Sequence, residues 1–128
     1  MTYLLDTHAL VWWLEGSDRL SAPARDAIGD PTARILVSAA SAWEIATKVR
    51  LGKLPGVAAV VGELPRIVAS QGFEPLPVSF EDGEAAGRLP GPHRDPFDRM
   101  LIAQSLGRDV PLVSLERAFD AYGVHRVW

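Results

Sequence analysis

The sequence has no cysteine among its 128 residues, so it can form neither a disulfide framework nor a metal site with thiolate ligands. It also lacks a long hydrophobic run. The apolar N-terminal stretch has no basic lead and is interrupted by Asp6 and His8, unlike a signal peptide or a membrane span. An excess of basic charge is missing too, because the net charge is −3. A polyanion would therefore have to bind a local patch of lysine and arginine.

What remains is the composition of a globular protein. Apolar residues make up 48% of the chain and charged residues 23%, with a mean hydropathy of +0.08 and no low-complexity tract. A chain of this length can bury one core, and no repeat or long linker divides it, so we expect residues 1–128 to form a single domain. Without cysteine or a targeting segment, the expected location is the cytoplasm, with no membrane association.

Short apolar runs alternate with helical patterns along the chain, which predicts βαβ units. We therefore expect an α/β/α sandwich around a central, mostly parallel sheet of about five strands. The run at 73–78 contains two prolines, which favours an edge strand. The expected strands are Tyr3–Leu5, Arg34–Ser38, Phe73–Val78, Pro111–Ser114 and His125–Trp128. The expected helices are His8–Glu15, Ala22–Gly29 capped by Ser21, Ser41–Lys53, two short helices in Val57–Ser70 separated at Pro65, Ser79–Leu89, Pro96–Leu106 and Arg117–Tyr122.

Acidic residues recur where the expected strands end. Asp6 follows the first strand, Glu44 lies in the first turn of the helix after the second strand, and Glu116 follows the strand at 111–114. In parallel sheets ligands bind outside the carboxyl ends of the strands, so these three side chains should share one rim. Asp95 and Asp98 open a helix that precedes a strand, and the pattern alone leaves its direction open.

Each of these acids also has a purely structural interpretation. Asp6 could cap the helix that follows it. The segments Ser41–Glu44 and Asp95–Asp98 both have the form of a capping box, with Pro96 at the favoured first helical position. Acids at a helix N-terminus are stabilised by the helix dipole by roughly 0.3–1 kcal/mol each, whatever their function. Taken singly, every acid is explained by this local role.

As a set, the acids favour a bound cation. Two carboxylates within about 4 Å repel by roughly 4 kcal/mol at an effective dielectric of about 20, so a cluster requires protonation or a cation. With no cysteine and three scattered histidines, the matching cation is hard, Mg²⁺ or Mn²⁺, held by carboxylates and water. Such ions activate water and stabilise phosphate oxygens in phosphodiester cleavage. The acids therefore predict a metal-dependent enzyme that acts on phosphate esters.

Four blocks of sequence carry a second signal, namely "LLDTHALVWWL" (4–14), "SAASAWEIATKVRLGKL" (38–54), "HRDPFDRMLIAQSL" (93–106) and "LVSLERAFDAYGV" (112–124). In this order and spacing they resemble a PIN-domain ribonuclease of the VapC toxin type. The resemblance covers nearly the whole chain. It implies a compact α/β/α fold, RNA cleavage that depends on Mg²⁺ or Mn²⁺, and inhibition by a cognate antitoxin protein.

The resemblance also implies roles for individual acids. By position, Asp6, Glu44 and Asp98 match the family's catalytic, metal-binding acids, and Asp95 is the extra acid of the "HRDPFDR" variant. The helix that Asp98 opens is then expected to present its N-terminus to the site.

The last block departs from the family pattern, which commonly has Thr-x-Asp. This chain has Ser114-Leu115-Glu116, whose carboxylate is one methylene longer, so a water-mediated role suits Glu116 better than direct contact with the metal. The mechanism expected from the resemblance is in-line attack by a metal-bound water, oriented by Asp95 or Glu116.

Several polar residues beside the acids are weaker candidates for substrate binding. Lys48 lies four residues after Glu44 on the same helical face, so it either meets RNA phosphate or pairs with the acid. A solvated or turn residue is the alternative interpretation of each candidate, and we assign no chemical role to His8, His93 or His125. The candidates are Thr7, Lys48, Arg94, Arg99 and Ser114.

The four tryptophans bear on possible partners. Trp12 and Trp13 are adjacent, so one can pack on the sheet while the other faces outward, where it would suit a homodimer or an antitoxin groove. Core packing is the expected role of Trp43 and Trp128.

Two alternatives to an antitoxin-controlled toxin stay open at the sequence level. One is a PIN-type nuclease that processes RNA and has no antitoxin. The other is a catalytically silent PIN-like or receiver-like binding module. A receiver should pair acids after its first strand and carry a lysine after a late strand. The single Asp6 and "PLVSLE" stand in those places and argue against it.

Overall fold

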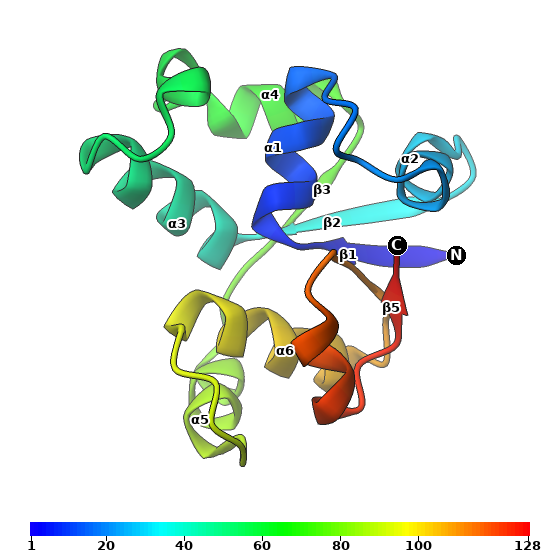
Figure 1. The fold of residues 1–128 in the computed structure, drawn as a ribbon, viewed down its shortest axis with the longest axis vertical. Helices are drawn as coiled ribbons and strands as arrows, with labels where there is room; N and C mark the ends of the chain where they lie inside the picture. Colours follow the sequence, from blue (N-terminus) through cyan, green and yellow to red (C-terminus); the bar gives the residue numbers. More distant parts are fainter.

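The computed structural model describes all 128 residues as a central sheet between two layers of helices (Figure 1). No helix has the length and apolar character needed to cross a bilayer. The strands are β1 (Thr2–Leu5), β2 (Arg34–Ser38), β3 (Glu74–Leu76), β4 (Leu112–Val113) and β5 (Arg126–Val127). The helices are α1 (Thr7–Glu15), α2 (Ala22–Gly29), α3 (Ala39–Arg50), α4 (Leu64–Ser70), α5 (Phe80–Arg88) and α6 (Pro96–Arg108), with short 3-10 helices η1 (Pro55–Val60) and η2 (Arg117–Tyr122).

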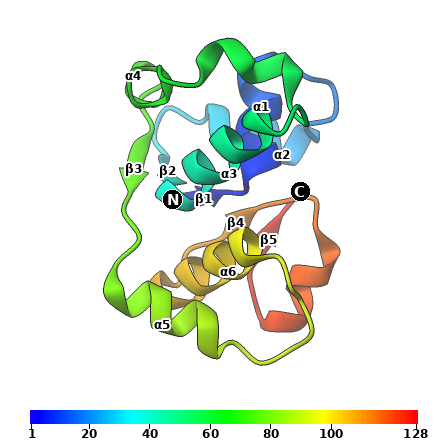
Figure 2. The same ribbon diagram turned by 90° about the vertical axis from the view of Figure 1, so that its left-hand side faces the viewer.

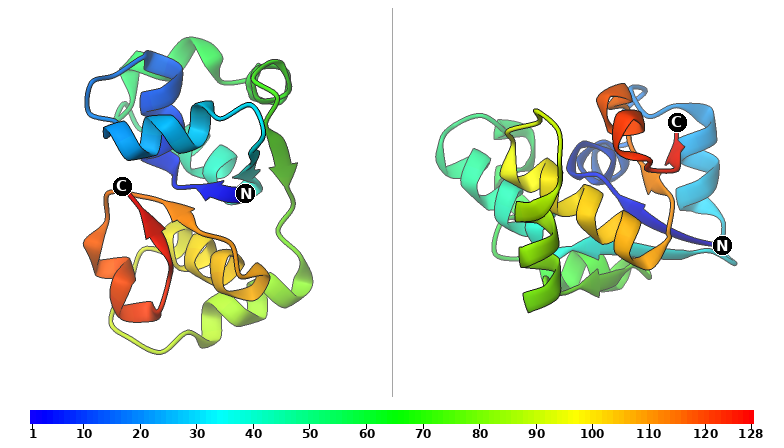
Figure 3. Two further views of the ribbon diagram at one scale, coloured as in Figure 1. Left: turned by 90° about the vertical axis from the view of Figure 1, so that its right-hand side faces the viewer. Right: turned by 90° about the horizontal axis from the view of Figure 1, so that it is seen from below.

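The sheet has five strands in the order β3-β2-β1-β4-β5, and every neighbouring pair is parallel. The predicted α/β sandwich is therefore confirmed, and β3 is an edge strand as its prolines indicated. Figure 3 shows β3 and β5 at opposite edges. From β1 the chain builds the sheet outward through β2 and β3, and then returns to add β4 on the other side. The carboxyl ends of β1 and β4 therefore form the switch point at which such sheets bind ligands.

The two faces of the sheet bury different cores. Helices α1 to α4 lie on one side and α5, α6 and η2 on the other (Figure 2). Successive strand residues point to opposite faces, so Leu5 and Val37 pack in the cluster under α1 to α4, whereas Leu4 and Leu36 pack in the cluster under α6. This double burial explains why the inner strands read as continuous apolar runs rather than alternating ones.

Two predicted helix starts are wrong. Helix α3 begins at Ala39, capped by the Ser38 side chain, so Ser41 and Glu44 do not form a capping box. Ser38 ends β2 as well, and the strand therefore passes into the helix with no intervening loop. Helix α4 begins at Leu64 with Pro65 in its first turn, so the chain breaks before this proline rather than at it.

A buried polar network joins α5 to α6. The Asp82 carboxylate accepts hydrogen bonds from Arg108 at 2.9 and 3.1 Å, from Gln104 at 3.1 Å and from the Ser79 amide at 3.0 Å. Burial opposes ionisation of Asp82, but these bonds hold its pKa well below the usual range. The network fixes α5 against the helix whose N-terminus carries Asp98.

The tryptophan predictions are only partly correct. Neither Trp12 nor Trp13 is left fully outward: Trp12 packs near Trp128, and the Trp13 indole donates to Gln71. Trp128 packs against the core as expected. Trp43 does not, because 64% of it is exposed.

Candidate active site

Asp6 lies directly after β1, at the centre of the switch point. It caps α1 by accepting the Thr7 amide at 2.7 Å, and its other oxygen accepts the Ser114 hydroxyl at 2.6 Å. Only 2% of Asp6 is exposed. Burial, with added repulsion from Glu44 and Glu116, raises its pKa to about 7 despite these hydrogen bonds. An ordinary capping aspartate is solvated and acidic, so capping alone does not explain this residue.

Glu44 is also buried, on the second turn of α3. One carboxylate oxygen forms an ion pair with Lys48, and the other, Oε1, is buried without any hydrogen-bond partner. The Thr7 hydroxyl donates to Ser41 at 3.0 Å and so links α1 to α3 beside this acid. Buried polar atoms are almost always satisfied, so this carboxylate oxygen is available to accept a hydrogen bond from water or to bind a cation.

Asp95 and Asp98 have different roles at the start of α6. The Asp95 side chain caps the helix by accepting the amides of Phe97 and Asp98, at 2.9 and 3.1 Å. Asp98 does not return a bond to Asp95 as a full capping box would. Its carboxylate instead meets His93 Nε2 at 2.7 Å.

The contact between α6 and α3 shows which way α6 points. The rings of Phe97 at the start of α6 and Trp43 on α3 have centroids 4.8 Å apart, so the N-terminus of α6 lies against the helix that follows β2. Burial raises the pKa of Asp98 to about 6 against the opposing His93 contact, and the charges of Asp6, Asp95 and Glu44 add to the rise. The structure brings Asp6, Glu44 and Asp98 to one rim with Asp95 beside them, a position that the residues alone had left open for Asp98.

Glu116 stands at the edge of the same rim. Its amide donates to the Ser114 hydroxyl at 3.0 Å, but its carboxylate is on an exposed residue and acts on Asp6 only through its charge.

Two histidines that the sequence reasoning left without a role belong to the site. His93 holds Asp98, as described above. His8 accepts the Leu115 amide through Nε2 at 3.0 Å, and its Nδ1 lies 3.4 Å from the Asp6 carboxylate. Burial lowers the pKa of His8. The signal available in the sequence was only proximity to an acid, and no local spacing rule predicts either contact.

The basic candidates separate into engaged and free groups. Lys48 pairs with Glu44, and although burial opposes its charge, this pair and the charges of Asp95 and Asp98 raise its pKa. Arg94 is exposed. The Arg99 guanidinium donates to three backbone carbonyls, so its observed role is to anchor the segment before α6 rather than to face phosphate. Those carbonyls belong to Ala86, Leu89 and His93.

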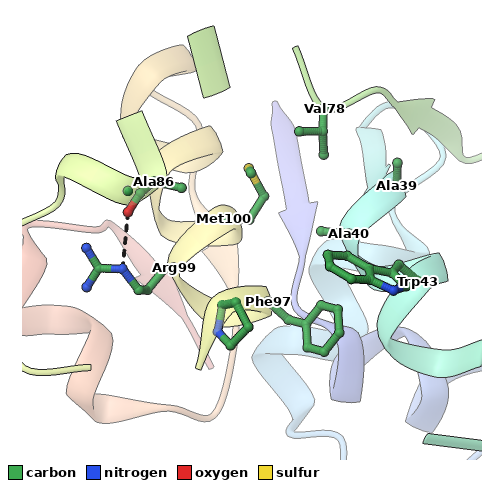
Figure 4. Close-up of a pocket in the computed structure, with 10 residues that line it drawn as sticks. Ala39, Ala40, Trp43, Val78, Ala86, Phe97, Arg99 and Met100 are labelled. Atoms are coloured by element: carbon green, nitrogen blue, oxygen red, sulfur yellow. Dashed lines mark hydrogen bonds between the residues drawn. The ribbon is translucent and has the colours of Figure 1, made fainter. Parts of the chain in front are cut away.

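An apolar cleft of about 440 Å³ lies between α3, α5 and α6, next to the acids. Figure 4 shows Trp43 and Phe97 on one side of it, with Val78 and Met100 above them. The ring of Trp43 meets that of Phe97 edge to face, with centroids 4.8 Å apart. Trp43 was expected in the core, so this cleft was not predicted from the sequence.

Comparison with known families decides the assignment. The family model of the PIN domain matches residues 3–124, almost the whole chain. The chain belongs to the PIN domain family. PIN domains are typically nucleases, and PIN nucleases generally use divalent metal ions. A comparison with curated proteins gives no match.

Three solved structures share this fold. The VapBC2 complex from Rickettsia felis, bound to a DNA fragment of its promoter, matches with a TM-score of 0.70 and 14% identity over all of both chains. VapC20 from Mycobacterium tuberculosis, a toxin that cleaves the sarcin-ricin loop, matches at 0.67 and 17% over 95% of each chain. FitAB bound to a DNA fragment matches at 0.60 and 14%, over 97% of this chain and 92% of the other.

The acids of this PIN domain have the right chemistry for Mg²⁺ or Mn²⁺. The donors are carboxylate oxygens, one of them the unpaired Oε1 of Glu44. Burial, with a smaller contribution from neighbouring carboxylates, raises the pKa values of Asp6 and Asp98, and a bound cation would favour their ionised forms. No three acidic or histidine side chains come close enough to form a complete metal site by themselves. Mg²⁺ usually keeps several waters, so water would complete the coordination of an ion held among these acids.

Proposed function

We propose that this PIN domain is a Mg²⁺- or Mn²⁺-dependent endoribonuclease of the VapC toxin type, which hydrolyses RNA phosphodiester bonds and is held inactive by a cognate antitoxin. The observation that carries the proposal is the coupling of Asp6, Glu44 and Asp98 at the switch point, with one Glu44 oxygen unpaired. Buried like charges with perturbed pKa values are typical of catalytic sites rather than of helix caps.

The proposed ligands are Asp6, Glu44 and Asp98. Ser114 and Thr7 hold Asp6 through its two oxygens, and Lys48 holds one oxygen of Glu44 and leaves Oε1 without a partner. When bound, the cation lowers the pKa of its water and stabilises charge on phosphate oxygens.

Water and substrate are positioned by the residues around these ligands. We assign the orientation of an attacking water to Glu116, an exposed residue whose charge acts on Asp6. Asp95 is assigned mainly to the start of α6, because its side chain accepts two backbone amides there. Lys48 and the exposed Arg94 supply positive charge for the RNA backbone beside the acids. The net charge of −3 makes this local patch, rather than the whole surface, the attractive part of the molecule.

The proposed protein partner is an antitoxin. Support comes from the similarity to VapBC2 and FitAB, both of which are toxin–antitoxin complexes solved on DNA. The antitoxin assignment rests on fold similarity and is separate from the chemistry of the acids. We also propose that the PIN domain forms a homodimer, as expected from the sequence.

The test is cleavage of structured RNAs by the purified protein. Cleavage is expected with Mg²⁺ or Mn²⁺, is expected to stop in EDTA and to return when the metal is restored, and should be abolished by Asp6→Asn. The exposed Asp26→Asn on α2 is the matched control and should cleave normally. Cleavage that persists in EDTA or in the Asp6 variant overturns the mechanism, and no cleavage of any RNA favours a silent binding module. Activity that no small DNA-binding protein inhibits favours an RNA-processing nuclease.

A further inference from the structure

Two aromatic residues stand next to two of the proposed metal ligands. Trp43 precedes Glu44 on α3, and Phe97 precedes Asp98 on α6. Adjacent residues of a helix point about 100° apart, so each carboxylate can turn to the switch point while its neighbouring ring turns into the cleft. The cleft therefore lies directly beside the acid site, on the same two helices.

The cleft has the shape and lining of a site for a flat apolar ring. Phe97 contacts Trp43 at an interplanar angle of 78°, and with 64% of Trp43 exposed a broad part of the indole stays uncovered. Small side chains of α3, such as Ala39 and Ala40, line the cleft as well, and Arg99 is its only charged residue. Its volume of about 440 Å³ falls within the range of roughly 300–1,000 Å³ that is usual for small-ligand sites.

We propose that this cleft binds one unpaired nucleobase of single-stranded RNA, stacked on the indole of Trp43. The proposal rests on the proposed function, because it is the phosphate held at the acids that brings the neighbouring base to the cleft. Charge supports this occupant: the exposed Arg94, in the segment that leads into α6, can meet the backbone of the strand whose base enters the cleft.

The lining also predicts how selective this contact is. Apolar walls offer few donors or acceptors for the edge of a base, so the cleft distinguishes a base from no base much more than one base from another. Purines, with the larger stacking surface, should bind more tightly than pyrimidines. Sequence preference in cleavage would then have to come from elsewhere in the RNA contact.

The test is a thermodynamic cycle between the protein and the RNA, measured as binding with Ca²⁺, an oxygen-liganded cation that can hold a phosphate at the acids. Recovery of intact RNA after each titration checks that cleavage plays no part. Short single-stranded RNAs carry one abasic nucleotide at each position in turn. Intact protein is compared with Trp43→Leu, which keeps an apolar side chain but removes the flat ring, and with Trp43→Phe, which keeps a ring. Phe80→Leu is the matched control, because Phe80 is 93% exposed and does not line the cleft.

Removing the base at one position should weaken binding by intact protein by about 5- to 150-fold, the range for one stacked base. The same removal should have little effect on Trp43→Leu, with Trp43→Phe between the two and Phe80→Leu like intact protein. The proposal is overturned if removal of a base lowers the RNA affinity of intact protein and of Trp43→Leu equally, or if no oligonucleotide binds. Light scattering provides a further check. If Trp43→Leu dissociates a dimer and the effect of removing a base is the same as in intact protein, the proposal is overturned and the cleft is assigned to a second copy of the chain.

The cycle and the cleavage assay can fail separately. Base coupling without metal-dependent cleavage would retain the base site and reject the proposed function. Metal-dependent cleavage without an effect of Trp43 on base recognition would retain the proposed function and reject the base site.

Discussion

Removing the charge of Asp6 is predicted to stabilise the metal-free protein at alkaline pH. Only 2% of Asp6 is exposed, and chiefly because of this burial the pKa of its carboxyl is raised from 3.8 to about 7. Between these two values the folded state binds more protons than the unfolded state, so the stability of the intact protein falls as the pH rises through this window. Asn has nearly the same shape and does not titrate.

The size of the effect follows from the same numbers. A pKa of about 7 instead of 3.8 corresponds to roughly 4 kcal/mol that ionisation costs the fold above pH 7, at about 1.4 kcal/mol per unit. Asn can still accept the Thr7 amide, but the Ser114 hydroxyl must turn to accept instead of donate. With about 1 kcal/mol lost there, Asp6→Asn should gain about 3 kcal/mol at pH 8 and nothing near pH 4.

Urea unfolding in EDTA, followed by tryptophan fluorescence at pH 4.5 and pH 8, measures this gap. Asp26→Asn is the control, and we expect no pH-dependent gain from it. Adding Mn²⁺ at pH 8 should stabilise intact protein but not the Asp6 variant, so the gap should narrow. An Asp6→Asn protein that is less stable than intact protein at pH 8, or a difference that does not change with pH, would refute the reasoning.

Further predictions concern the groups around the acids. His93→Ala should lower Mn²⁺ affinity and the cleavage rate by roughly 10- to 100-fold, because it releases Asp98, and His93→Gln should recover part of both. If Ala and Gln behave alike, the hydrogen bond is not what matters. Arg108→Met should destabilise the fold at pH 7 by about 1–3 kcal/mol in urea unfolding, because Asp82 stays buried without its ion pair. The pKa of Asp82 is lowered in the fold, so this loss should shrink below pH 4 as the carboxyl becomes protonated. A loss that is equal at pH 3.5 and pH 7 would contradict the assignment.

The sheet and the position of Asp6 were predictable from sequence because both follow from local patterns. Apolar runs separated by helical segments indicate parallel strands, and the residue after the central strand must lie at the carboxyl edge. The role of Asp95 was predictable as well, since Asp-Pro is a strong helix start whatever the tertiary structure. The direction of α6 was different: the residues alone left it open, and only the family resemblance indicated it.

The remaining features depend on contacts that no spacing rule describes. Glu44 has a lysine four residues later on its own helix, so the pair was expected, but the unpaired second oxygen becomes visible only in the folded protein. His93 reaches Asp98 because Arg99 and Tyr122 hold the chain before α6, a contact made through backbone groups. Trp43 was assigned to the core because tryptophan usually packs there, and its exposure reflects the open cleft.

The central claim is that Asp6, Glu44 and Asp98 together hold a divalent cation, and binding of Mn²⁺ tests it most directly. Electron paramagnetic resonance titration at pH 8 should show Mn²⁺ bound to intact protein and to the control Glu84→Gln, whose side chain is on an exposed residue of α5. Binding should be lost or weakened at least tenfold in Glu44→Gln, which removes the charge beside the unpaired oxygen. Equal affinity for Mn²⁺ in Glu44→Gln and intact protein would contradict the account.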